Sequence, residues 1–200
     1  GQGGGVVNVF DRMAQGNAAP IRAVGSREAG LGGIPTVDYE HNLLIVEGRN
    51  GLYIYDRTAN GDVKPLRIIT GGPKAGTSAP GNPVWIPGTR NFVASAQKFG
   101  NAARAAGGPV NPQTAEEART VIGVWSIDDD GDVAPRYITA TNFFKGLRTI
   151  VVDPKHKTMI ASDKTANNIT TWDFREAWDT FAPEKAERYV SPRGGRGGGE

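Results

Sequence analysis

The feature that most constrains the fold is a glycine-then-proline segment that occurs three times in register. The glycines are Gly16, Gly61 and Gly131, and a proline follows each of them four positions later. These copies align without gaps, although the arginine after the proline lies one position earlier in the third copy. Repetition of one segment is typical of folds that use the same supersecondary unit several times.

A second segment recurs between these copies. Residues 36–41 read Thr-Val-Asp-Tyr-Glu-His and residues 151–156 read Val-Val-Asp-Pro-Lys-His, and each precedes a short hydrophobic run. Residues 83–88 form a weaker copy, and residues 169–173 begin the first segment once more. Each unit therefore holds four short β-branched or aromatic runs, which in the second unit lie near 35–38, 43–47, 52–56 and 64–69. Such runs, bounded by Gly, Pro, Asn and Asp, predict strands.

The turn residues of the repeat indicate how these strands are connected. Asn60-Gly61 and Asp130-Gly131 tolerate a positive φ, so we expect tight hairpin connections at these positions. The proline that follows has no N–H to donate, which predicts that its strand lies at a sheet edge. A four-stranded unit of about 45 residues with such a last strand is typical of a β-propeller blade. We predict an all-β fold with three to four blades of four antiparallel strands.

The order aromatic-Asp-Arg, Gly, Pro, Arg and Ile or Val, followed by Val-Asp and a short strand, resembles bacterial NHL-like β-propeller repeats. More distantly, it is similar to lactonase and gluconolactonase propellers. This resemblance covers residues 6–173 and implies architecture rather than activity, because propellers host many functions. Such families usually close with about six or seven blades. We therefore expect a C-terminal part of a longer propeller; the alternatives are a ring completed by a partner and an open arc of sheets.

The pattern also predicts domain boundaries. We expect a flexible start over 1–5, blades over 6–173 with an insertion at 97–120, a C-terminal helix or extension over 174–190 and a flexible Gly/Arg tail over 191–200. Phe174, Ala177, Trp178 and Phe181 have the spacing of one apolar helical stripe. One interpretation is a short helix that covers a blade edge or the base of the ring. The other is an aromatic anchor for another subunit, which uses Trp178 and Phe181.

Composition excludes several classes of function. The 23 basic and 21 acidic residues leave a net charge of +2, which predicts no nucleic-acid partner. No apolar run approaches the roughly 18 residues that a membrane span needs. The absence of cysteine excludes disulfides and thiol catalysis. Together with the resemblance, it favours an extracytoplasmic location, periplasmic or secreted.

Candidate binding residues lie in the loops. If the strands run from the axis outward, the connections that enter each blade and the connections between its second and third strands share one face. Loops on a rigid scaffold commonly carry function, and the insertion lies on this face. Its candidate partner-binding residues are Phe99, Arg104 and Glu116.

Candidate chemical groups are sparse. Residues 128–132 (Asp-Asp-Asp-Gly-Asp) could suggest calcium, but the other copies lack such ligands, which favours a plain hairpin turn. His41 and His156 lie in equivalent turns of different blades, and we expect Asp38 and Asp153 to cap those turns.

No Gly-x-Ser-x-Gly elbow, phosphate loop or His-Glu-x-x-His motif is present, so we assign no catalytic residue and expect no cofactor. If the chain carried a metal site on the propeller axis, as the lactonase resemblance implies, Asn50, Asp163 and Asn167 lie in suitable loops.

The sequence therefore predicts a non-enzymatic β-propeller module that binds a protein partner or an extended ligand through its loop-bearing face. Its partner could also be the remaining propeller blades, and the chain would then be a subunit of a larger assembly. Two alternatives stay open: a lactonase-like or other hydrolase with a metal on the propeller axis, and a structural component of a surface or filament.

Overall fold

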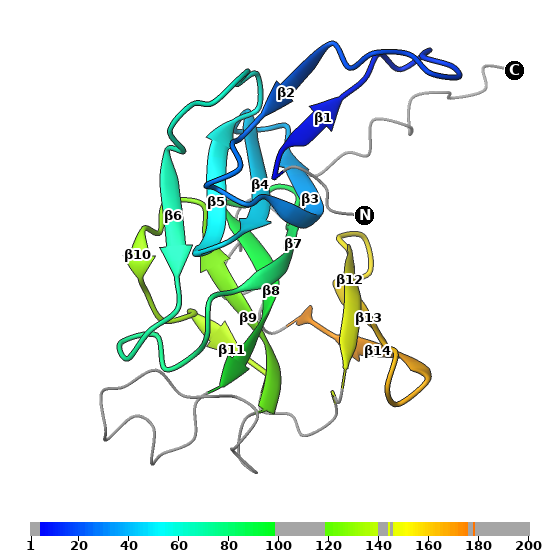
Figure 1. Ribbon diagram of the computed structural model, residues 1–200. Helices are drawn as coiled ribbons and strands as arrows, with labels where there is room; N and C mark the ends of the chain where they lie inside the picture. The colour runs from blue at the N-terminus through cyan, green and yellow to red at the C-terminus, as the bar shows by residue number, and fades with distance from the viewer. Residues whose placement is uncertain (1–4, 99–118, 140–143, 145, 176–177, 179–200) are drawn as a thin grey trace, which may run out of the picture.

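The computed structural model describes residues 5–98, 119–139, 144, 146–175 and 178, and its strands form four sheets (Figure 1). The fold is all-β, as predicted. The first sheet pairs β1 (Val7–Val9) with β2 (Arg22–Val24). The second contains β3 (Gly32–Asp38), β4 (Leu43–Gly48), β5 (Gly51–Asp56) and β6 (Arg67–Thr70). The third contains β7 (Gly81–Trp85), β8 (Asn91–Lys98), β9 (Arg119–Ser126) and β11 (Tyr137–Ile138), and the fourth contains β12 (Leu147–Asp153), β13 (Thr158–Asp163) and β14 (Asn168–Asp173).

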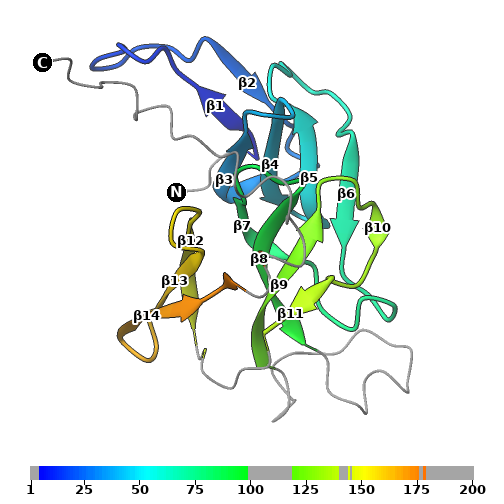
Figure 2. The same cartoon turned by 180° about the vertical axis from the view of Figure 1, so that it is seen from behind.

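Within each sheet, strands that are consecutive in the chain pair antiparallel, in the order in which they occur. The exception is β10 (Gly131–Asp132), which belongs to a connection of the third sheet but pairs parallel with β6 of the second. The prediction that the strand after each repeat proline lies at a sheet edge is therefore wrong for β6, which β10 covers, and holds for β2 and β11. Figures 1 and 2 show the sheets following one another in chain order, with β1–β2 at one end of the series and β12–β14 at the other.

The repeat glycines share one backbone conformation. Gly16, Gly61 and Gly131 have φ of 59°, 80° and 76°. Gly16 and Gly61 lie in connections between strands, and Gly131 begins the two-residue strand β10. The predicted positive φ is confirmed. The predicted tight hairpins are wrong, because the connections run over 57–66 and 127–136, well beyond a two-residue turn.

These longer connections reach the preceding sheet. The backbone N–H of Gly61 donates to the carbonyl of Ala23 in β2 at 2.6 Å, and Asn60 Oδ1 accepts the N–H of Ala23 at 3.3 Å. One repeat later, Asp130 Oδ1 accepts the N–H of Ile68 in β6 at 2.9 Å. The Asn/Asp-Gly pair therefore recurs because it joins neighbouring sheets, in addition to its turn geometry.

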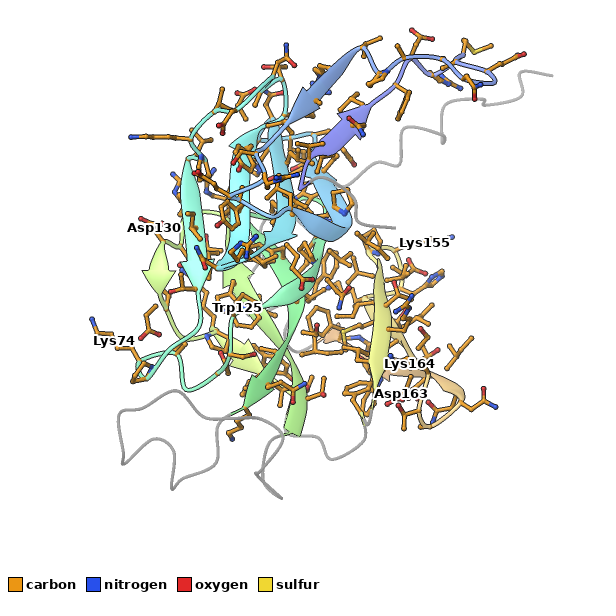
Figure 3. The ribbon with its side chains drawn as sticks, viewed as in Figure 1. Lys74, Trp125, Asp130, Lys155, Asp163 and Lys164 are labelled. Atoms are coloured by element: carbon orange, nitrogen blue, oxygen red, sulfur yellow. The ribbon has the colours of Figure 1, made fainter. Side chains whose placement is uncertain are left out.

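Three hydrophobic clusters fill the spaces between consecutive sheets. Val24 packs with Tyr53 and Tyr55 between the first two sheets. The second cluster lies between the second and third sheets and includes Leu52, Ile54, Ile69, Phe92 and Trp125; Figure 3 shows Trp125 in the middle of the molecule. The third lies between the third and fourth sheets and includes Ile122, Val124, Ile150, Met159 and Trp178. Strands β4 and β5 of the second sheet read as nearly continuous apolar runs because both of their faces are covered.

The strands β8 and β9 extend into the predicted insertion. Gln97 and Lys98 pair with Thr120 and Arg119 as the ends of β8 and β9, and Gln97 Nε2 donates to Thr120 Oγ1 at 2.8 Å. The insertion predicted at 97–120 therefore shortens to 99–118, which lies outside the described residues. Most of the helix predicted over 174–190 also lies outside them, although the N–H of Trp178 donates to the carbonyl of Phe174 at 2.9 Å, an i→i+4 bond. In the described ranges, no helix combines the length and hydropathy that crossing a membrane requires.

Candidate functional site

One side of the molecule collects the two kinds of loop that the repeat predicts to share a face. In the second sheet, the N–H of Arg49 in the β4–β5 turn donates to the carbonyl of Ala29 at 2.9 Å. In the third sheet, the N–H of Ser78 donates to the carbonyl of Gln97 near the end of β8 at 2.8 Å. In the fourth, the N–H of Lys164 donates to the carbonyl of Gly146 at 3.0 Å. We call this side the loop rim: residues 26–31, 48–51, 72–80, 146 and 163–168, with the ends of β8 and β9 that flank 99–118.

The opposite side, which we call the turn rim, is also built the same way three times. The residue that leaves each third strand donates its N–H to the turn between the first and second strands: Arg57 to Asn42 at 2.8 Å, Ile127 to Arg90 at 2.9 Å and Phe174 to Lys157 at 2.9 Å. In Figure 3, Lys155 marks the turn rim, whereas Asp163 and Lys164 lie at the other end of β13.

The two histidines lie on the turn rim in equivalent surroundings. Asp38 Oδ1 accepts the N–H groups of Glu40 and His41 at 3.0 and 2.9 Å, and its Oδ2 lies 2.7 Å from the His41 ring Nδ1. Asp153 repeats this arrangement, with its Oδ2 2.6 Å from Nδ1 of His156. That contact lowers the pKa of the Asp153 carboxyl below its usual value. The prediction that both aspartates cap their turns is confirmed.

The acidic run at 128–132 is divided among different partners. Arg90 donates two hydrogen bonds to the Asp128 carboxylate, at 2.8 and 2.6 Å, and they hold the pKa of that carboxyl below its usual value. Arg136 pairs in the same bidentate manner with Asp129, one of its bonds measuring 2.8 Å. Each carboxylate is therefore committed to an arginine rather than turned towards a common cation.

The remaining carboxylates of this run bind backbone. Asp130 accepts from β6, and Asp132 accepts the N–H groups of Lys74 and Ala75 at 3.0 and 2.7 Å. The Asp132 contacts tie the connection at 72–80 to the connection between β9 and β11. Figure 3 labels Lys74 and Asp130 on this side of the molecule. The contacts of Asp130 and Asp132 are those of a structural turn, which the repeat alignment favours over a calcium loop.

The candidate metal ligands come from two different sheets. Asn50 lies in the exposed β4–β5 turn of the second sheet, whereas Asp163 and Asn167 belong to the fourth. Asp163 is buried, and its carboxylate accepts three backbone N–H groups, from Thr165 and Ala166 at 2.9 Å each and from Gly146 at 3.0 Å. A carboxylate bound in this way closes the β13–β14 loop and has little capacity left for a cation.

An open pocket of about 530 Å³ lies beside that loop, lined by Arg148, Ser162, Asp163, Lys164, Asn167, Asn168 and Ile169. Across the part of the chain that the structure describes, no three His, Asp or Glu side chains are grouped as metal ligands would be.

Among the candidate partner-binding residues, Phe99, Arg104, Glu116 and Phe181 lie outside the described residues. Trp178 is 1% exposed and packs with Phe174 in the cluster between the third and fourth sheets. Of the two interpretations of the aromatic stripe, this burial favours cover for the chain's own sheets, because a buried indole is not available to another subunit.

Sequence reasoning missed two sets of residues that the structure brings out. Asn60 and Asp130 each accept a backbone N–H group from the preceding sheet. Both stand directly before a repeat glycine, and this shared position in the sequence could have pointed to a common role. Phe10 is exposed although it aligns with the buried Tyr55 and Trp125. That alignment was visible in the repeat, but the difference in exposure was not.

Comparison with known proteins adds no assignment: no family model matches the chain, and no curated protein matches it. The resemblance to NHL-like repeats therefore stays a prediction.

Proposed function

We propose that the four sheets are successive blades of a β-propeller-type arc. We further propose that the chain is a non-enzymatic binding module that presents its loop rim to a protein partner or extended ligand, as a subunit of a larger assembly. The observation that carries the proposal is the loop rim itself. In three sheets a backbone hydrogen bond joins the same two segments, although its direction is reversed in the third sheet, and the chain inserts a long segment, 99–118, at only one of these β-hairpins.

The order of the sheets supports the propeller-type arrangement. Each sheet packs on the preceding one through an apolar cluster, and the repeat turns hydrogen-bond across two of these junctions. Stacked sheets of this kind hold their loops on a rigid base. Loops on a rigid base can recognise a partner without a large loss of conformational entropy.

The chemistry of the described side chains also supports binding rather than catalysis. Asp38, Asp153 and Asp163 are the most conspicuous carboxylates at strand ends, and each accepts at least two backbone N–H groups. Groups held in this way stabilise turns.

The test removes 99–116 and joins the flanking residues with a short Gly-Asn linker. The wild-type chain, the deletion and a Lys155→Ala control on the turn rim are immobilised, and the proteins that each retains are identified. Any common protein is then purified and titrated against all three chains. We expect the deletion to weaken binding at least tenfold and the control to bind as wild type, while all three keep the same melting transition. Equal binding by the deletion would refute the proposal.

A further inference from the structure

An aromatic residue near the end of the third strand closes each junction onto the preceding sheet. Tyr55, near the end of β5, is 1% exposed and packs with Val24 of the first sheet. Trp125, near the end of β9, is 0% exposed and packs with Ile69 of the second sheet. Phe10 aligns with both of them in the repeat and yet is 50% exposed. The first sheet therefore carries the aromatic residue of a junction but leaves it half exposed.

Neighbouring residues extend this exposed surface. Side chains alternate between the two faces of a strand, so Asn8 and Phe10 point away from the second sheet while Val7 packs towards it. Asn8 pairs with Ala23 of β2, and Val6 is exposed beside them. We call these residues, Val6, Asn8, Phe10 and Ala23, the leading face.

The fourth sheet carries the opposite kind of surface. Its register places Val151, Ile160 and Thr171 in one row, with Ile169 in the next row on the same face. This face points away from the cluster that the fourth sheet shares with the third, which contains Met159 and Ala161 instead. Ile169 is 75% exposed and Val151 is about half exposed. We call these residues, Val151, Ile160, Ile169 and Thr171, the trailing face.

Alignment of the sheets shows what such a face normally contacts. In the second sheet, the residues equivalent to Ile160, Ile169 and Thr171 are Ile45, Leu52 and Ile54. All three are fully buried and pack against the third sheet. Ser162 of β13 and Ile169 of β14 line the open pocket of about 530 Å³, so this pocket lies at the trailing face.

At every internal junction, the face of one sheet that is equivalent to the leading face packs on the face of the preceding sheet that is equivalent to the trailing face. The chain thus displays both halves of one more junction, on its first and fourth sheets. We propose that two copies of this chain bind head to tail, with the leading face of each on the trailing face of the other. Two such contacts close a ring of two times four sheets, and propellers have about four to eight blades.

A second copy is the occupant that these observations favour. One chain type supplies both complementary faces, and the internal junctions already show that the two kinds of face pack together. Left open, the two faces expose the large apolar side chains of Phe10, Val151 and Ile169, whereas a closed ring buries them. This inference rests on the proposed propeller-type arrangement, but not on the role of the loop rim.

Sedimentation velocity from about 1 µM to about 100 µM, a range that resolves micromolar dissociation constants, tests the inference. We expect the wild-type chain to reach twice its monomer mass of 21.2 kDa. Phe10→Asp and Ile169→Asp each place a carboxylate in the contact, and each should weaken dimerisation at least ~30-fold. The matched control is Leu66→Asp, since Leu66 is 56% exposed but lies on neither face, and it should dimerise as wild type.

A mixture of the two variants gives a sharper result. A mixed pair of Phe10→Asp and Ile169→Asp retains one contact with both faces intact, so the mixture should dimerise more tightly than either variant alone. Both sites are exposed in the single chain, so circular dichroism should show the wild-type fold for each variant.

A wild-type chain that stays at 21.2 kDa throughout would overturn the inference, as would face variants that dimerise like the control. The 99–116 deletion should still form the dimer. If the deletion loses its partner but still dimerises, the result bears only on the proposed role of the loop rim. If the wild-type chain binds a partner but stays a monomer, the result refutes only the head-to-tail contact.

Discussion

Replacing Trp125 with alanine is the most direct test of the sheet-on-sheet packing. The indole is fully buried between the second and third sheets, its ring lies 6.4 Å from that of Phe92, and its Nε1 donates to the carbonyl of Val133 at 3.2 Å. A tryptophan buries about 150–250 Å², which at about 25 cal/mol per Å² corresponds to about 4–6 kcal/mol. Truncation of a large aromatic side chain in a core costs about 3–5 kcal/mol. We therefore expect Trp125→Ala to lower the free energy of unfolding by about 4–5 kcal/mol.

Equilibrium unfolding in urea, followed by far-ultraviolet circular dichroism, measures this change. Trp125→Phe keeps an aromatic ring but removes the N–H donor, so its loss should lie between those of wild type and Trp125→Ala. Leu66→Ala serves as the control, since this exposed side chain should change stability by no more than about 0.5 kcal/mol. A loss below about 1 kcal/mol for Trp125→Ala, or one equal to that of the control, would refute the packing argument.

The repeat glycine gives a second prediction: Gly61 has a φ of 80° and open space where a Cβ would lie, so Gly61→Ala should cost about 1–2 kcal/mol through backbone strain alone, in the same unfolding assay. In Gly123→Ala, the new Cβ would lie 2.6 Å from the Trp125 ring; we expect a larger loss that shrinks in the Trp125→Ala background, and additive losses would contradict this clash. The last prediction concerns pH. The hydrogen bond from Arg90 lowers the folded-state pKa of Asp128, so its stabilising contribution is present above the ordinary pKa of the carboxyl and is lost as the pH falls through the folded value. A carboxyl NMR titration of Arg90→Gln should show the Asp128 pKa move up towards its ordinary value, and an unchanged pKa would contradict the assignment.

Local features of the fold could be predicted well from the sequence. The runs near 43–47 and 52–56 became β4 and β5, the repeat glycines have positive φ, and Asp38 and Asp153 cap their turns. Each of these properties depends on residues a few positions apart, whose side-chain alternation, backbone preference or hydrogen-bonding reach is set locally.

The misses concern residues far apart in the chain. The connections around Gly61 and Gly131 were expected to be tight because the Asn/Asp-Gly pair suits a short hairpin, and the preceding sheet that draws them out cannot be seen in a local pattern. The insertion was drawn too long because the pairing of Gln97 with Thr120 joins segments that look like loop. Among the candidate site residues, Asp163 binds the backbone of its own loop and of Gly146, and Trp178 is buried between sheets; both contacts involve segments that a local pattern does not show.

The amino-acid sequence by itself determined the unit: a short strand pattern, a left-handed glycine and a strand that follows a proline, repeated along the chain. These follow from side-chain shape and backbone preference, which act over a few residues. Only the tertiary structure decided which faces of those units are covered. Phe10, Tyr55 and Trp125 are chemically alike and occupy the same repeat position, yet two are buried and one is half exposed, because burial depends on whether another sheet lies across that face.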